Sequence, residues 1–296
     1  MSAARGRGIL SHAMARVLIV GCGYVGSALA ELLAGVGHEV FGVRRDVSAL
    51  PDGIAPVRAD VSRPDGIGGL PARIDFIFYM VGAKVRDADS YRAAYLDGLG
   101  HLLRVLGEEG QAPQRILFTS STAVYGQSRG EWVDEESPTH PRGFAGEIML
   151  TTERLLHGSP HPSTIVRLGG IYGPGRTRLL DAAISKQPVA EREPPSFSNR
   201  IHRDDAAGAL AHLIGLEEPA PLYVGVDSEP ADPSDVQRWI AGELGVVLAV
   251  AEQPDSRPSG GKRCRNERLV ASGYDFLFPT YREGYGEILR ARGSGS

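Results

Sequence analysis

Cysteine is scarce in this sequence: the 296 residues include two, Cys22 and Cys264, and no C-x-x-C pair. This usage cannot supply a disulfide framework and is typical of proteins kept in a reducing compartment. No apolar run approaches the roughly 18 residues that a membrane-spanning helix needs. The basic residues near the start are not followed by the apolar segment of a secretory signal. We therefore expect a cytoplasmic protein that does not enter a membrane.

An excess of positive charge is also missing, since 32 Lys and Arg residues stand against 36 Asp and Glu residues. A net charge of -4 and dispersed basic residues argue against nucleic acid or a membrane surface as a partner. With 42% hydrophobic residues the chain can bury a sizeable core. We expect a globular protein whose partners are a small-molecule substrate and, as a candidate, a second copy of itself in a homodimer.

Metal and hydrolase signatures are absent as well. His157 and His161 have the H-x-x-x-H spacing, but the glycine and proline between them interrupt the helix that would put both on one face. No G-x-S-x-G segment is present, and Ser121 has no plausible His and Asp partners for a hydrolytic triad. We expect no metal site.

Glycine, by contrast, is abundant, and one glycine cluster predicts a binding site. Residues 17–20 form a continuous apolar run, which predicts a strand buried on both faces. A G-x-G-x-x-G turn follows, and the next residues have helical spacing. In this context the turn predicts a dinucleotide site, because the helix N-terminus presents N–H groups to the pyrophosphate. The residues expected to contact the cofactor here are Gly21, Gly23, Tyr24, Val25 and Gly26.

The next predicted strand, residues 38–43, ends in Arg44 and Arg45, where an acidic residue would bind the ribose hydroxyl of NAD. Two guanidinium groups can instead pair with a 2'-phosphate. The sequence thus favours NADP (NADPH) over NAD. A solvated arginine pair is the alternative.

Three further predicted strands, residues 56–61, 76–81 and 115–119, alternate with helical segments such as residues 91–106. This alternation predicts an α/β fold of the Rossmann type, with a doubly wound parallel sheet. The carboxyl ends of these strands are expected to border the cofactor. The residues there are Asp60, Val61, Val81, Gly82, Thr119 and Ser120.

Four segments together carry a family resemblance: S-S-T-A-V-Y-G at residues 120–126, R-L-G-G-I-Y-G-P-G-R at 167–176, R-I-H-R-D-D at 200–205 and Y-V-G-V-D at 223–227. They resemble the extended short-chain dehydrogenases/reductases, the NAD(P)-dependent epimerase/dehydratase group. The resemblance implies a Rossmann domain over residues 16–173, to which residues 200–217 return. It also implies a small mixed α/β substrate-binding cap from residues 174–199 and 218–292. Residues 1–15 are expected to be a flexible extension and residues 293–296 a linker.

Two departures from the family pattern concern catalysis. The resemblance implies a serine followed by Y-x-x-x-K, in which the tyrosine exchanges a proton and the lysine lowers its pKa. Ser121 fits the serine, and Glu153 fits the glutamate four residues beyond the lysine. Counting back puts Met149 at the lysine and Ala145 at the tyrosine, and neither can do this chemistry. The pattern is similar to that of atypical members of the superfamily.

If catalysis persists, other residues must exchange the proton. The candidates are Ser121, Tyr95 on the helix that passes the site, and Glu147 between the two vacated positions. Their alternatives are a serine that only contacts substrate, a half-buried helix tyrosine and a solvated helix glutamate. The candidate substrate-binding residues are Thr122, Tyr172, Arg176 and Arg203.

The sequence thus predicts an NADP(H)-binding protein related to the short-chain dehydrogenases. Its predicted activity is that of an oxidoreductase or an epimerase/dehydratase on a small polar, sugar-like substrate. The alternative is a non-catalytic regulator or sensor that responds to NADP(H).

Overall fold

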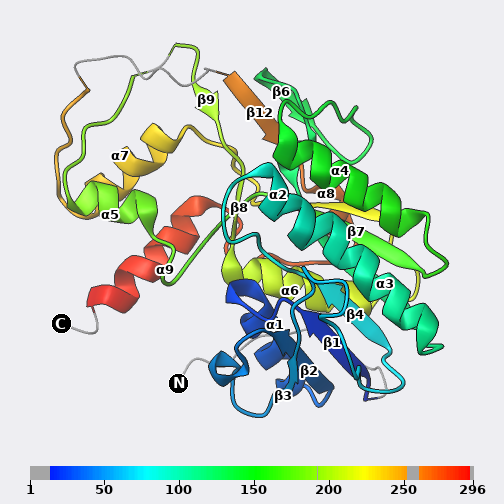
Figure 1. The fold of residues 1–296 in the computed structure, drawn as a ribbon. Coiled ribbons are helices and arrows are strands. Elements are labelled where there is room, and N and C mark those ends of the chain that lie inside the picture. Colours follow the sequence, from blue (N-terminus) through cyan, green and yellow to red (C-terminus); the bar gives the residue numbers. More distant parts are fainter. Residues whose placement is uncertain (1–13, 192, 252–259, 294–296) are drawn as a thin grey trace. The chain divides into compact units, whose positions relative to one another are not determined.

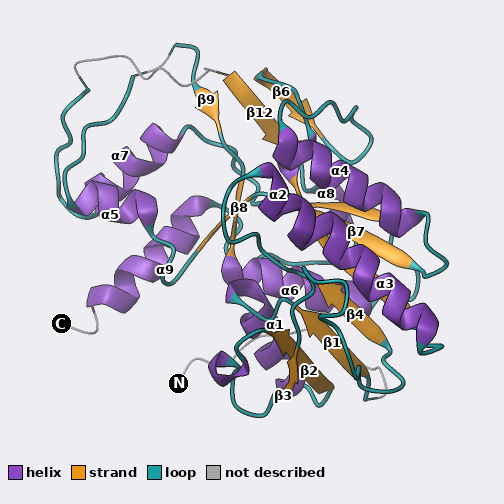
Figure 2. Ribbon diagram, viewed as in Figure 1, coloured by secondary structure: helices purple, strands orange, loops and turns teal. Residues whose placement is uncertain are grey.

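The computed structural model describes residues 14–191, 193–251 and 260–293. Its main feature is a parallel sheet of seven strands in the order β11-β7-β5-β4-β1-β2-β3 (Figures 1 and 2). These strands are β1 (Arg16–Val20), β2 (Glu39–Arg44), β3 (Ala55–Arg58), β4 (Phe76–Tyr79), β5 (Arg115–Ser121), β7 (Ser163–Leu168) and β11 (Leu222–Gly225).

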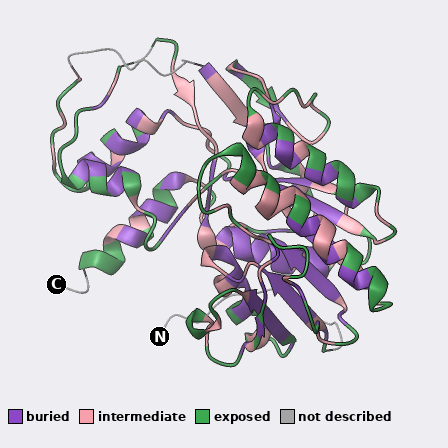
Figure 3. Cartoon of the chain, viewed as in Figure 1, coloured by how far each residue is buried: buried purple, intermediate pink, exposed green. Residues whose placement is uncertain are grey.

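The sheet is doubly wound, as the sequence predicts. From β1 the chain builds β2 and β3 on one side, then crosses back to β4 and builds outward in the other direction. The order reverses between β1 and β4, and ligands of such sheets bind beyond the carboxyl ends of the strands at this switch point. Both β1 and β4 are buried over nearly their whole length, because helices cover the two faces of a doubly wound sheet (Figure 3).

The helices of the sheet divide between its two faces because right-handed crossovers in opposite directions leave them on opposite sides. α1 (Tyr24–Gly35) joins β1 to β2, and α3 (Gly98–Glu108) joins β4 to β5. α4 (Phe144–His157) packs against β5 and against α3 (Figure 1).

The helix predicted over residues 91–106 begins earlier and is not regular. It comprises α2 (Ala88–Tyr91), the π-helical segment η2 (Arg92–Asp97) and α3. The apolar residues of α3 recur every three or four positions and face the core, as the sequence predicts. The π-helical turn is not visible in that periodicity.

The chain divides into two compact units. Unit 1 comprises residues 1–124, 141–167 and 207–223, and unit 2 comprises residues 125–140, 168–206 and 224–296. The helix α6 (Arg203–Ile214) crosses the division. Residues 1–13 and 294–296, most of the predicted extension and linker, lie outside the described residues.

Unit 2 holds two small parallel sheets and several helices. One sheet pairs β8 (Gly170–Tyr172) with β10 (Arg200–His202), and the other has the order β6-β12-β9. The remaining elements of this unit are β6 (Arg129–Val133), α5 (Arg178–Ile184), β9 (Ser196–Phe197), α7 (Pro233–Glu243), β12 (Gly260–Cys264), α8 (Glu267–Ala271) and α9 (Tyr281–Gly293). An apolar core of α5, α7 and α9 side chains holds these three helices together.

Near Val250 the described chain forms a single bridge, to Val189, and no strand. Val246 and Leu248 pack against the helical core of the unit instead of entering a ladder. α5 comprises seven residues and β12 five. Both elements are short, and tertiary packing overrides weak local propensity in such segments.

No helix among the described residues combines the length and the apolar character needed to cross a bilayer.

Candidate functional site

The glycine turn after β1 is held by close backbone contacts. Gly21 has a φ of 93°, and a Cβ there would lie 2.6 Å from the Met80 carbonyl carbon. A Cβ on Gly26 would lie 2.7 Å from the Gly21 carbonyl oxygen, so α1 can approach the turn only with glycine at that position. Gly23 differs, because the nearest atom to its Cβ would be the Gly21 oxygen at 3.9 Å. The space over Gly23 is therefore open, which suits a ligand that approaches the backbone.

The N-terminus of α1 opens beside this turn. Gly23 is the N-cap residue, and within the described chain no side chain caps the helix and no acidic residue lies in its first turn. The backbone of Tyr24, Val25 and Gly26 thus forms the start of a 12-residue helix with a positive dipole end. This is a site for an anionic group such as a pyrophosphate.

Arg44 at the end of β2 is oriented toward the turn. Its Nη1 donates to the carbonyl oxygen of Cys22 at 3.0 Å and to that of Ala49 at 3.1 Å. Arg45 is exposed. These contacts hold one guanidinium beside the glycine turn, while the other projects into solvent.

The ends of β3 and β4 complete this edge of unit 1. The Asp60 carboxylate accepts hydrogen bonds from the backbone and hydroxyl of Ser62, and the hydroxyl bond, at 2.6 Å, is the main reason that its pKa is lowered. Val61 is buried, whereas Gly82 is exposed. The Val81 nitrogen lies where a Cβ on Gly21 would clash, at 2.6 Å.

The residues at the end of β5 make different contacts. The Thr119 hydroxyl donates to the Tyr79 carbonyl oxygen at 3.3 Å, and the Ser121 hydroxyl accepts from the Ala123 N–H at 3.1 Å. Thr122 is buried. The Ser120 hydroxyl donates to Glu153 at 2.5 Å inside the core, so its side chain has a structural hydrogen bond. Any contact of Ser120 with a cofactor must come from its backbone.

Glu153 is the centre of a buried network that the sequence indicated only through the family pattern. Arg167 on β7 donates from Nε to one carboxylate oxygen at 3.0 Å and from Nη2 to the other at 2.7 Å. Glu153 and Arg167 side chains are 4% and 7% exposed. The network ties β5, α4 and β7 together and fixes the strand end that carries Ser121.

Tyr95 lies in the π-helical segment η2. Its hydroxyl interacts with the backbone of Ala83, just beyond β4, and its ring contacts that of Tyr91 at a centroid distance of 5.2 Å. Burial is the main cause that raises the pKa of Tyr95. Tyr91 in turn meets Phe144, the first residue of α4, edge to face at 5.3 Å. The phenol is thus held at the carboxyl edge of the sheet and is protonated at neutral pH.

The first turns of α4 carry the vacated positions of the family pattern. Ala145 is partly exposed, Met149 is buried and Glu147 is exposed. A Cβ on Gly146 would lie 2.3 Å from the Ala123 carbonyl oxygen, so α4 packs closely on the turn that follows Ser121. α4 also packs against η2, which carries Tyr95. The structure thus brings the elements of Ser121, Tyr95 and Glu147 together within unit 1.

Three of the four predicted substrate-binding residues belong to unit 2, namely Tyr172, Arg176 and Arg203. Tyr172 is buried and stacks on Tyr285 with a centroid distance of 4.7 Å. Arg203 donates to Asp204 at 2.7 Å, and Arg176 is exposed. Tyr172 therefore has a packing role in the core of its unit. Among the described residues, no group of three or more His, Cys, Asp or Glu side chains is arranged to hold a metal ion.

Comparisons with known proteins match this architecture. Residues 17–210 fit the model of the NAD dependent epimerase/dehydratase family. A structure of a putative NAD-dependent epimerase/dehydratase from Methylobacillus flagellatus is 37% identical, with 95% of this chain and 99% of that chain covered and a TM-score of 0.79. A 3-diazoavenalumate denitrifying reductase of Streptomyces is 26% identical over 92% of this chain and 99% of its own length.

Human epimerase family protein SDR39U1, whose structure contains NADPH, is 22% identical, with 92% and 98% of the two chains covered and a TM-score of 0.75. At 22% sequence identity, this similarity shows a common fold and no more. The family match spans the glycine turn, the strand ends and the first turns of α4 described above. The chain belongs to the NAD dependent epimerase/dehydratase family.

Proposed function

We propose that this protein is an NADP(H)-dependent reductase of a small polar carbonyl compound, with Tyr95 as its proton donor. The observation that carries the proposal is the partly buried Tyr95 phenol, which lies beside the Ala83 backbone just beyond the carboxyl end of β4. It lies on the segment that packs against α4, where the family pattern has its tyrosine and lysine.

The residues of unit 1 fit a dinucleotide. The open space over Gly23 and the uncapped start of α1 suit the pyrophosphate, and the strand ends of β3, β4 and β5 suit the rest of the molecule. Arg44, fixed beside the turn, and the exposed Arg45 offer guanidinium groups to a 2'-phosphate. NADPH is therefore the preferred cofactor, and when bound it would supply the hydride.

The state of Tyr95 favours reduction over oxidation or epimerisation. Reduction of a carbonyl needs an acid that protonates the new alcohol oxygen, whereas the first step of an epimerase needs a base that takes a proton. Burial raises the pKa of Tyr95, and position 149, where the family has a lysine to lower it, is occupied by Met149. The neutral phenol is an acid at pH 7. We propose Ser121 as a second proton donor.

A sensor that binds NADP(H) without turnover is the second candidate, and the side chains of Ala145 and Met149 favour it because neither can exchange a proton. Single-turnover experiments separate the two functions. The protein is loaded with NADPH, and loss of cofactor absorbance is followed with methylglyoxal and phenanthrenequinone as general carbonyl probes. Turnover above the uncatalysed rate excludes a pure sensor. Absence of turnover with every carbonyl probe contradicts the reductase proposal.

The role of Tyr95 is tested by Tyr95→Phe, which removes only the hydroxyl. We expect kcat to fall about 100-fold, within the usual range for a lost general acid, while the affinity for NADPH stays unchanged. Tyr91→Phe is the matched control, because Tyr91 shares the ring cluster but is not proposed to donate a proton. Equal kcat values for Tyr95→Phe and wild type would remove Tyr95 from the mechanism.

A further inference from the structure

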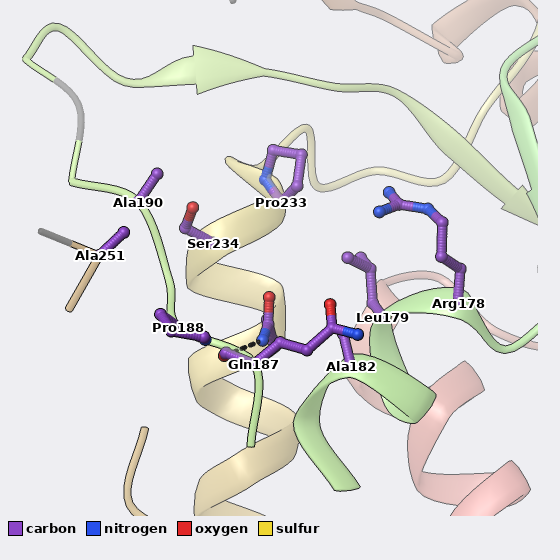
Figure 4. A pocket seen from close by; sticks show the side chains of 10 residues that line it. Arg178, Leu179, Ala182, Gln187, Pro188, Ala190, Pro233, Ser234 and Ala251 are labelled. Atoms are coloured by element: carbon purple, nitrogen blue, oxygen red, sulfur yellow. Dashed lines mark hydrogen bonds between the residues drawn. The ribbon is translucent and has the colours of Figure 1, made fainter. Parts of the chain in front are cut away.

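A pocket of about 280 Å³ lies within unit 2, between α5, α7 and the segment around Pro188 (Figure 4). The two helices pack against each other, and the Gln237 side-chain amide of α7 donates to the Gln187 carbonyl oxygen at 2.8 Å (Figure 4). The volume lies just below the usual range of ligand pockets, roughly 300–1,000 Å³. It suits one small molecule and is too small for a dinucleotide.

Four polar side chains line this pocket with unused hydrogen-bonding capacity. Ser234 and Gln237 are 7% and 8% exposed, so each is more than nine-tenths buried. In the described chain neither the Ser234 hydroxyl nor the Gln237 amide oxygen has a hydrogen-bond partner. Both atoms belong to pocket-lining residues, so they are free to hydrogen-bond to a molecule in the pocket.

The other two polar groups are at the mouth. Arg178 and Gln187 are exposed, and the described residues give neither the Arg178 guanidinium nor the Gln187 side-chain amide a hydrogen bond or ion pair. Figure 4 shows the Arg178 guanidinium and the Ser234 hydroxyl on opposite sides of the pocket. A ligand that spans it can reach both.

The charge around the pocket limits the ligand to a monoanion. Arg178 is the one charged residue among the described residues that line it. Asp232 caps α7 next to the pocket, with its carboxylate accepting from the Ser234 N–H at 2.8 Å and the Ser196 N–H at 2.7 Å. A single guanidinium beside a buried carboxylate cannot neutralise the two or more charges of a phosphate ester or nucleotide. It matches one carboxylate, which its planar fork binds through two parallel hydrogen bonds.

From these observations we infer that the pocket between α5 and α7 binds a small hydroxycarboxylate of the sugar-acid type. Arg178 binds the carboxylate, and the Ser234 hydroxyl with the Gln237 and Gln187 amides binds the hydroxyl groups. Leu179, Pro188 and Pro233 form the apolar walls. This assignment does not depend on the cofactor or on Tyr95.

The test uses the full chain without NADPH, with gluconate as the probe and isothermal titration calorimetry as the measurement. Glucose is the neutral counterpart, and UMP is a nucleotide with two negative charges. We expect gluconate to bind at least tenfold more tightly than either compound. Undetectable gluconate binding at millimolar concentrations, or equal or tighter binding of glucose or UMP, overturns the assignment.

Variants then locate the bound molecule. Arg178→Gln, at an exposed position, should weaken gluconate binding at least tenfold, and Ser234→Ala should weaken it about threefold, since a bond to a charged group exceeds one to a neutral group. Arg238→Gln is the matched control, because Arg238 is exposed on α7, the helix that carries Ser234, and pairs with Asp235. Unchanged affinity in both pocket variants places gluconate elsewhere and overturns the assignment. Since NADPH is absent, this result is independent of the reductase assay.

Discussion

Glu153 of α4 and Arg167 of β7 form a two-pronged ion pair inside the core of unit 1, with oxygen–nitrogen distances of 3.0 and 2.7 Å. The Ser120 hydroxyl donates to the same carboxylate. A carboxylate in this position is tolerated because three donors compensate for the loss of water. The pair holds the strand end that carries Ser121 against the helix that carries the vacated catalytic positions.

Arg167→Met should therefore destabilise the protein by about 3–5 kcal/mol, because it leaves the Glu153 carboxylate buried without a counter-charge. Adding Glu153→Gln should recover part of the loss, since a neutral amide can still accept the Ser120 hydroxyl bond. Urea denaturation of the two variants measures the difference. If the double variant is less stable than Arg167→Met alone, the buried charge is not the cause.

Gly23→Ala separates cofactor binding from folding. Its Cβ would enter open space, with the nearest atom at 3.9 Å, so we expect less than about 1 kcal/mol of destabilisation. The methyl group would, however, occupy the place of the pyrophosphate, and the rise in Tm with NADPH should disappear. Gly35→Ala in the same helix has nothing within 4 Å and should keep the full rise. A normal NADPH response in Gly23→Ala would place the cofactor elsewhere.

The arginine pair after β2 should set the cofactor preference. We expect NADPH to raise the Tm more than NADH, and Arg44→Ala with Arg45→Ala to abolish the difference by removing the partners of the 2'-phosphate. Since Arg44 also bonds to the Cys22 and Ala49 carbonyl oxygens, the Tm without cofactor is the baseline for each variant. Arg154→Ala, at an exposed position of α4, is the control. Equal shifts with both cofactors in the wild type would contradict the preference.

Asp227 in unit 2 should make stability depend on pH. Burial is the main cause that raises its pKa to about 8, and one carboxylate oxygen has no partner among the described residues. A carboxyl group whose pKa is higher in the folded than in the unfolded protein makes its full contribution to stability at low pH. Its contribution is lost as pH rises from the ordinary value of 3.8 to about 8, since the unfolded chain ionises first.

Asp227→Asn removes this titration. The variant should match the wild type near pH 4 and exceed its stability by roughly 2–5 kcal/mol above pH 8, because burying the charged form is the cost that disappears. Thermal unfolding of both proteins across this range measures the difference. A difference that does not change with pH would mean that Asp227 keeps its ordinary pKa in the folded protein.

Several features could be read from residue order alone because they depend on local chemistry and periodicity. The continuous apolar runs of β1 and β4 predict strands buried on both faces, and the turn between β1 and α1 can be formed only with glycine at Gly21 and Gly26. The alternation of strands and helices then determines a doubly wound parallel sheet. The missing Tyr and Lys of the family pattern are likewise visible as Ala145 and Met149.

Other features exist only after the chain has folded. The Ser120 hydroxyl lies in the core, because α4 and β7 bring Glu153 and Arg167 to it. The π-helical turn that carries Tyr95 has no signature in the apolar spacing, since it depends on how η2 packs against α4. The pocket beside Arg178 combines α5 with α7 from about 50 residues further along the chain. The sequence by itself determined the sheet and the nucleotide turn, because backbone sterics and burial are local. Tertiary packing decided which polar side chains form hydrogen bonds, because their partners come from segments far apart in the sequence.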